Sequence, residues 1–143
     1  MIKEEVKQKL EGKIKDWHIK NPKRIYFSVG RQDLKYTADT LYDQFKMRFA
    51  TASGADNVKN LEILYHFSFD KTGEIFSIRV FVDKNNPEID SLISLFKGAI
   101  WIERELHEML GIKFIGHPDP EHLLLKEGWP EGSYPLRKDY KDE

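Results

Sequence analysis

The sequence has 143 residues, of which 40% are hydrophobic and 33% are charged, and its formal net charge is -1. At about 150 residues per domain, this length fits one domain with its own hydrophobic core. The near-neutral charge excludes a generally basic nucleic-acid-binding protein. The absence of cysteine excludes a disulfide scaffold, a cysteine nucleophile, a thiolate zinc site and a self-contained iron–sulfur cluster. No apolar run approaches the ~20 residues that span a bilayer, and the charged N-terminus does not resemble a signal peptide, so we expect a cytoplasmic protein.

The N-terminal third of the chain is predicted to form two helices separated by a strand. An amphipathic helix is expected over residues 3–19, because four apolar residues recur there at the spacing of one helical stripe: Val6, Leu10, Ile14 and Trp17. A strand follows over residues 23–30, and a second helix over residues 37–49, with Thr37 as its cap.

Residues 60–82 carry the clearest β pattern, because apolar and polar side chains alternate along two runs. The turn between them is expected at residues 70–73, with Gly73 at positive φ. Residues 49–55 can add another short strand. A helix is then predicted to start at Asn86-Pro87, and another to run from Ala99 to Leu110.

Residues 111–143 differ from the rest, since they hold four of the six prolines and four of the nine glycines. Such a stretch cannot form long regular elements, yet it carries leucines and aromatic residues that need a surface to pack on. The expected fold class is therefore α/β (α+β): an antiparallel-rich sheet, helices packed on one face and an irregular Pro/Gly-rich C-terminal segment. We expect one domain over residues 1–143, with a body over 1–110 and an extended docking segment over 111–143.

The densest charged cluster lies in the helix predicted for residues 99–110. A helical wheel places a buried stripe at Ala99, Ile102, Leu106 and Met109. A neighbouring flank collects Trp101, Arg104, Glu105 and Glu108, which are close enough to touch at i, i+4 spacing. The flank is either a solvated face with a weak ion pair or a polar contact surface, in which Trp and Arg are favoured anchors.

A metal or hydrolytic site is the alternative interpretation of the same region. Carboxylate and imidazole groups gather between positions 105 and 122, at Glu105, His107, Glu108, His117 and His122. Their spacing does not match the two-histidine helix of zinc proteases. A stand-alone metal- or carboxylate-dependent hydrolase that uses Glu105, Glu108 and His117 remains open.

Two short motifs follow the charged helix. The run from His117 through Pro118 and Asp119 to Pro120 is typical of a rigid turn. The run over residues 135–140 is either a frayed tail or a docking strip in which Arg137 binds a carboxylate.

The order of these motifs, from Trp101-Ile102-Glu103-Arg104-Glu105 to the closing Pro135-Leu136-Arg137-Lys138-Asp139-Tyr140, resembles one family. That family is the C subunit of NADH-quinone oxidoreductase, which is the thirty-kilodalton subunit of respiratory complex I and is shared with membrane-bound energy-converting hydrogenases. The resemblance is specific over residues 101–140.

The resemblance implies a non-catalytic subunit without a cofactor or metal, in the peripheral arm of a membrane-bound oxidoreductase complex on the cytoplasmic side. The implied partners are the large subunit, which is related to the large chain of nickel–iron hydrogenases, and a neighbouring iron–sulfur subunit. Nucleic acid is not implied, and the membrane is reached only through the complex. The resemblance assigns interface or structural roles to these residues: Trp101, Glu103, Arg104, Glu105, Glu108, Gly111, His117, Pro118, Asp119, Pro135, Leu136, Arg137, Lys138, Asp139 and Tyr140.

Overall fold

The alternating residues 60–82 form a β-hairpin, made of strands β4 (Asn60–Phe69) and β5 (Glu74–Asp83). In the turn, Gly73 has a φ of +80° and its N–H donates a 2.9 Å hydrogen bond to the carbonyl of Phe69. Glycine adopts this left-handed conformation without steric cost. The predicted hairpin and its glycine are therefore confirmed. The computed structural model describes residues 1–117.

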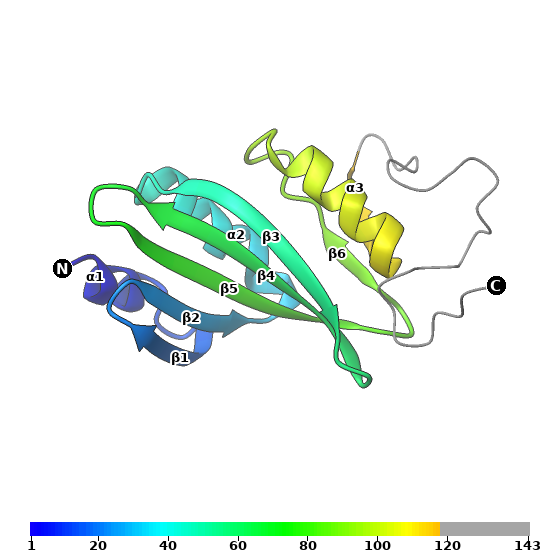
Figure 1. Ribbon diagram of the computed structural model, residues 1–143, viewed down its shortest axis with the longest axis horizontal. Helices are drawn as coiled ribbons and strands as arrows, with labels where there is room; N and C mark the ends of the chain where they lie inside the picture. The colour runs from blue at the N-terminus through cyan, green and yellow to red at the C-terminus, as the bar shows by residue number, and fades with distance from the viewer. Residues whose placement is uncertain (118–143) are drawn as a thin grey trace. The chain divides into compact units, whose positions relative to one another are not determined.

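The hairpin belongs to a five-stranded sheet with the strand order β1-β2-β5-β4-β3 (Figure 1). The outer strands are β1 (Ile14–Asn21) and β3 (Arg48–Asp56), and β2 (Arg24–Val29) lies between β1 and β5. Strand β2 pairs antiparallel with β1 and parallel with β5. A mixed α/β fold with a mostly antiparallel sheet matches the predicted class, and β3 confirms the additional strand expected at residues 49–55.

The prediction of a helix over residues 3–19 is confirmed only for its first half. Helix α1 covers only Ile2–Lys9, and the chain turns at Gly12, whose φ is +85°. The apolar stripe that suggested one helix is divided between α1 and β1. Trp17 of β1 stacks on Phe27 of β2, with ring centroids 5.6 Å apart. Tertiary packing of this kind overrides a short periodic pattern.

The helix predicted over residues 37–49 starts earlier and ends earlier than expected. A 3-10 turn, η1 (Arg31–Asp33), leads into α2 (Leu34–Asp39), and a π-helical turn, η2 (Thr40–Gln44), ends the helical segment. The chain is already extended at Phe49, which belongs to β3 and packs against Phe67, 5.5 Å away between centroids.

The described chain divides into two compact units, and strands β3, β4 and β5 run through both. Unit 1 contains residues 1–51 and 64–80. Its core is formed by the inward-facing side chains of β2, β4 and β5 with apolar residues of α1 and α2, and α2 passes behind the strands in Figure 1.

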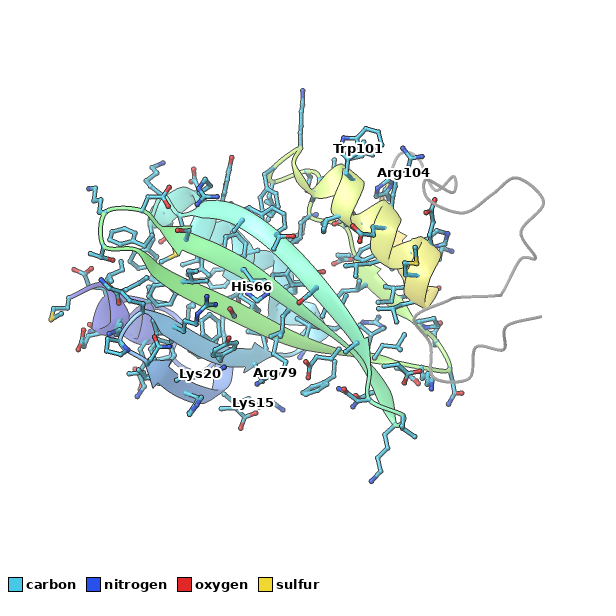
Figure 2. All side chains as sticks on the ribbon, in the orientation of Figure 1. Lys15, Lys20, His66, Arg79, Trp101 and Arg104 are labelled. Atoms are coloured by element: carbon cyan, nitrogen blue, oxygen red, sulfur yellow. The ribbon has the colours of Figure 1, made fainter. Side chains whose placement is uncertain are left out.

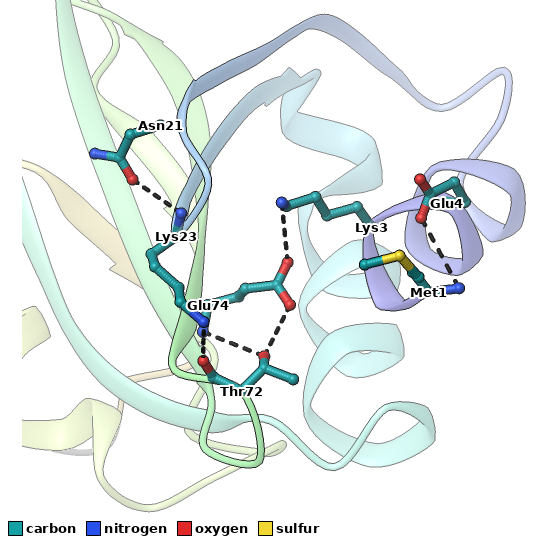
Figure 3. A network of polar contacts seen from close by, with 7 residues as sticks. All are labelled: Met1, Lys3, Glu4, Asn21, Lys23, Thr72 and Glu74. Carbon is teal, nitrogen blue, oxygen red and sulfur yellow. Dashed lines mark hydrogen bonds and ion pairs between the residues drawn. The ribbon is translucent and has the colours of Figure 1, made fainter.

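A polar network fastens α1 within unit 1 (Figure 3). The Lys3 ammonium lies 3.6 Å from the buried carboxylate of Glu74, at the start of β5. The Thr72 hydroxyl donates a 2.8 Å hydrogen bond to the same carboxylate, and the Lys23 ammonium donates to the Thr72 carbonyl. Because Glu74 is buried, these partners offset the cost of removing its charge from water.

Unit 2 contains residues 52–63 and the chain from Phe81 onward. Its regular elements after the hairpin are β6 (Glu88–Asp90), α3 (Ala99–Leu110) and β7 (Lys113–Ile115), with β6 parallel to β7. The prediction of a helix that begins at Asn86-Pro87 is therefore wrong. This segment instead forms β6, which pairs with β7, the strand that follows α3. The prediction of a helix over residues 99–110 is confirmed.

Candidate functional site

Helix α3 has a close approach to strand β3 within unit 2, and Gly54 makes it possible. A Cβ at Gly54 would lie 2.5 Å from Leu110 Cδ1 and 2.8 Å from Leu106 Cδ2, closer than van der Waals contact permits. Both leucines are buried. The helix stops directly afterwards at Gly111, whose φ is +77° and whose N–H donates to the His107 carbonyl at 2.9 Å. These two glycines set the packing and the length of α3.

Glu103 of α3 is fully buried and anchors the segment that follows β6. Its carboxylate accepts a 2.6 Å hydrogen bond from the Ser91 hydroxyl and a 2.7 Å hydrogen bond from the Leu92 N–H. Burial raises the pKa of Glu103, while these two hydrogen bonds and the charge of His117 oppose that rise. The carboxylate thus acts as an internal clamp between α3 and the preceding loop.

Two histidines connect α3 with the chain that follows it. His107 Nδ1 lies 3.0 Å from the Ile112 carbonyl oxygen, and His117 Nε2 lies 3.0 Å from the Ile100 carbonyl oxygen. A carbonyl oxygen only accepts hydrogen bonds, so each of these ring nitrogens carries the proton and donates it. Both imidazoles therefore hold backbone in place.

The exposed flank of α3 is formed by Trp101 and Arg104 (Figure 2). The Trp101 side chain is 57% exposed, and the Arg104 guanidinium carbon lies 5.0 Å from the centroid of its ring. This is the geometry of a cation–π contact, which favours one mutual orientation of the two side chains. A large exposed aromatic side chain that is already ordered costs little conformational entropy when a partner covers it.

A pocket of about 390 Å³ opens beside this flank. Its walls come from β6, α3, β7 and the residues just after β7, and the described residues that line it are Glu88, Arg104, His107, Lys113, Phe114, Ile115, Gly116 and His117. The lining combines charged side chains of both signs with the apolar side chains of Phe114 and Ile115. Arg104 belongs both to the pocket and to the flank, so the two form one continuous surface.

Glu108 belongs to the predicted charged flank of α3 at i+4 from Arg104, yet its side chain is fully buried, so the flank is not a uniformly solvated face. Of the four predicted flank residues, Trp101 and its i+4 neighbour Glu105 are exposed and Arg104 is half-buried. Glu103 shares the buried side of α3 with Leu106 and Leu110, whereas Glu108 is buried on the same flank as Arg104. The helix therefore buries two carboxylates, one on each of two sides.

The residues considered for metal binding or hydrolysis do not assemble within residues 1–117. No group of three or more His, Asp or Glu side chains suited to a metal ion occurs in this part of the chain. The described lining of the pocket contains His117 but neither Glu105 nor Glu108. His122 lies outside the described residues, as do the remaining predicted site residues: Pro118, Asp119, Pro135, Leu136, Arg137, Lys138, Asp139 and Tyr140.

Sequence reasoning missed Ser91, Glu88 and Lys113, which help to build this region. Glu88 and Lys113 are paired across the β6–β7 ladder. Such short strands give no periodic signal, and a Ser–Glu contact between separate segments has no local signature. Gly54 was also missed, although an isolated glycine in a strand pattern is a sign of close backbone approach.

Comparison with known proteins gives a family match over most of the chain. Residues 27–143 match the family described as respiratory-chain NADH dehydrogenase, 30 Kd subunit. The C subunit of the NADH-quinone oxidoreductase of Chelativorans sp. is 32% identical over 142 residues, which cover 94% of this chain and 68% of the relative. The J subunit of the NAD(P)H-quinone oxidoreductase of Prochlorococcus marinus is 45% identical over 89 residues, which cover 57% of this chain. That match spans about half, 49%, of the length of the Prochlorococcus relative.

Two solved structures share the fold. A chain of the membrane-bound sulfane sulfur reductase, an archaeal respiratory membrane complex, superposes with a TM-score of 0.86 at 17% identity, over 98% of this chain and 84% of that chain. A trypsin-resistant fragment of Nqo5 superposes with a TM-score of 0.66 at 24% identity, over 82% of this chain and 96% of that chain. Among the described residues, no helix has the length and apolar character needed to cross a membrane.

Proposed function

The chain belongs to the family of the 30 Kd subunit of respiratory-chain NADH dehydrogenase, and we propose that it acts as a docking subunit of a membrane-bound oxidoreductase complex. The observation that carries this proposal is the family match, which includes α3 and continues to residue 143. In this role the chain contributes no catalysis and no cofactor of its own. It holds other subunits in place while they transfer electrons, in a process coupled to ion translocation.

We propose that the partners are the large, nickel–iron-hydrogenase-like subunit and a neighbouring iron–sulfur subunit, in the peripheral arm on the cytoplasmic face of the membrane. The surface that supports this proposal is the flank of α3 with the adjoining pocket. Trp101 and Arg104 are residue types that dominate the binding energy of protein interfaces, and the pocket beside them can receive a side chain of the partner. In the same proposal, residues 111–143 are the extended docking segment.

The geometry of α3 agrees with a structural role for its other charged residues. Glu103 and His117 hold neighbouring backbone, and the side chain of Glu108 is fully buried. A general acid or base must reach its substrate, and a fully buried carboxylate does not. No observation among the described residues favours the hydrolase alternative.

The test is co-expression of the tagged full chain with the large subunit of the same complex, followed by affinity capture. The double variant Trp101→Ala/Arg104→Ala is expected to capture about 100-fold less large subunit, since each of two central anchors contributes about 1–2 kcal/mol. The matched control is Lys13→Ala/Tyr36→Ala, which removes another exposed cation–π pair, with the ammonium 4.9 Å from the ring centroid. Equal capture by both double variants, with folds intact by circular dichroism, would contradict the proposed docking flank.

A further inference from the structure

The sheet of unit 1 has one face that carries no helix among the described residues (Figure 1). Side chains alternate along each strand, so Ile25 and Phe27 of β2 point into the core and their neighbours point to the opposite face. The register extends this outer face across the adjacent strands, because Tyr26 pairs with His18 of β1 and with Ser77 of β5. The helices α1 and α2 do not cover it.

The outer face is strongly cationic. Its described basic residues are contributed by three neighbouring strands: Lys15 and Lys20 of β1, Arg24 of β2 and Arg79 of β5. Figure 2 shows Lys15, Lys20, His66 and Arg79 on the same region of the sheet. Within the described part of the chain, Lys15, Lys20 and Arg24 form no ion pair.

Carboxylates are scarce around this face. The outward positions of β2, of β4 and of β5 in unit 1 contain none. Asp16 of β1 sits at the irregularity between Lys15 and His18, where its φ is +57°. Asp70, just beyond β4, is engaged with Arg48 at 3.1 Å. Among the described residues, no carboxylate therefore pairs with Lys15, Lys20 or Arg24 on this face.

The position of Arg79 gives this face the character of a binding surface. The Arg79 guanidinium lies over the Tyr26 ring, 6.0 Å from its centroid, which fixes the direction of its donors.

Protection of the edge strand against pairing with another sheet explains only some of the basic residues on the outer face. Lysines on an edge strand prevent two sheets from joining, and that accounts for Lys15 and Lys20 of β1. It does not account for Arg24 and Arg79, which lie on the interior strands β2 and β5.

We propose that the outer face of unit 1, defined by Lys15, Lys20, Arg24, Tyr26 and Arg79, is a second docking surface that binds a carboxylate-rich segment of a neighbouring protein subunit. Charge complementarity points to an acidic partner, and the Arg and Tyr at the centre are typical of protein interfaces. Half-buried Leu64 and Ile75 add apolar contact, which an anionic membrane surface does not require. This surface rests on the proposed function, and it is separate from the flank of α3.

The test uses the complex captured through a tag on the large subunit and washed with increasing salt. Lys15→Glu/Lys20→Glu reverses two charges of the outer face. The control Lys9→Glu/Lys35→Glu makes the same change on exposed lysines of α1 and α2. We expect the outer-face variant to be retained about tenfold less than the wild type at physiological salt, and the control to be retained like the wild type. Circular dichroism melts establish that both variants fold.

Equal retention of both variants at every salt concentration, with the wild type retained, would overturn the second docking surface and leave the proposed function intact. A wild-type chain that is not captured at all would overturn both. The isolated chain is also mixed with phosphatidylserine vesicles and with duplex DNA. Binding to either probe that is lost only in the outer-face variant, with retention in the complex unchanged, would assign the face to a membrane or to nucleic acid and overturn the proposal.

Discussion

Glu103 shows how one side chain determines the local structure around α3. It is the first buried carboxylate of the helix, and it accepts hydrogen bonds from Ser91 and Leu92 of a separate segment. Removal of this carboxylate would leave both donors in a dry environment. A buried donor without a partner costs about 1–3 kcal/mol.

We therefore predict that Glu103→Ala lowers the free energy of unfolding by about 3 kcal/mol, measured by urea denaturation followed by circular dichroism. Glu103→Gln should cost less, because its amide oxygen can still accept from the Leu92 N–H and its amide group can donate to the Ser91 hydroxyl. A Glu103→Ala variant as stable as Glu103→Gln would show that the clamp is not important.

His66 makes the folding stability of the protein depend on pH, and the sign of that dependence follows from its pKa. Its Nδ1 lies 2.7 Å from the Ser77 hydroxyl, and burial, followed by the positive charge of Arg24, lowers the pKa of His66. In the unfolded chain a histidine has a pKa of about 6.5, so just below that pH the unfolded state binds more protons than the folded state. Stability therefore rises with pH in this interval.

We predict that the His66 contribution to the free energy of unfolding is fully present above about pH 6.5 and is lost as the pH falls towards the lower, folded-state pKa. Denaturation curves between about pH 5 and pH 8 should show this loss in the wild type and a smaller loss in His66→Gln. A direct NMR titration of the His66 ring checks the cause. A folded-state pKa above about 6.5 would contradict the prediction.

At the scale of elements, the packing of α3 against β3 depends on the absence of a side chain at Gly54. The tips of Leu106 and Leu110 occupy the space that a Cβ would need. Both are buried, so they have little room to move, and overpacking of a core costs about 1–3 kcal/mol.

Gly54→Val should accordingly lower the thermal midpoint, with a loss of about 1–3 kcal/mol of stability. Ala55→Val is the matched control, because Ala55 is the next residue of the same strand and is exposed. If both variants melt at the same temperature, the close approach at Gly54 does not limit the packing of α3.

The elements that could be predicted from the sequence are those whose apolar periodicity extends over many consecutive residues and whose end is marked by a nearby glycine. The hairpin over residues 60–82 has a regular alternation and a glycine turn, and α3 ends at a glycine. The predicted helix over residues 3–19 failed because Ile14 and Trp17 have helical spacing in the sequence, whereas they belong to β1, whose pairing is irregular between Lys15 and His18. Gly12 was the available signal. Strand β6 could not be predicted, because its pairing with β7 is a long-range interaction.

The candidate site was predicted in part for a similar reason. The exposed position of Trp101 and its contact with Arg104 follow from helical spacing. The burial of Glu103 and Glu108 does not, because a charged residue is buried only where partners from other segments reach it. Helical spacing assigned Glu108 to the charged flank, and Glu103 was placed neither on that flank nor in the buried stripe.

At the scale of the whole molecule, the family match and the structural roles of the buried polar groups of α3 support the proposal of a subunit that holds others together. The two proposed docking surfaces are the flank of α3 with its pocket in unit 2, and the cationic outer face of unit 1. Each surface lies within its own unit, so each can be disrupted separately.

The central claim is that this chain is an integral subunit of a membrane-bound oxidoreductase complex. The most direct measurement is native mass spectrometry of the complex purified from detergent-solubilised membranes through a tag on this chain. We expect one copy of the chain together with the large and iron–sulfur subunits, in a fixed ratio. Recovery of the tagged chain alone, while the other subunits assemble into a complete complex without it, would contradict the claim.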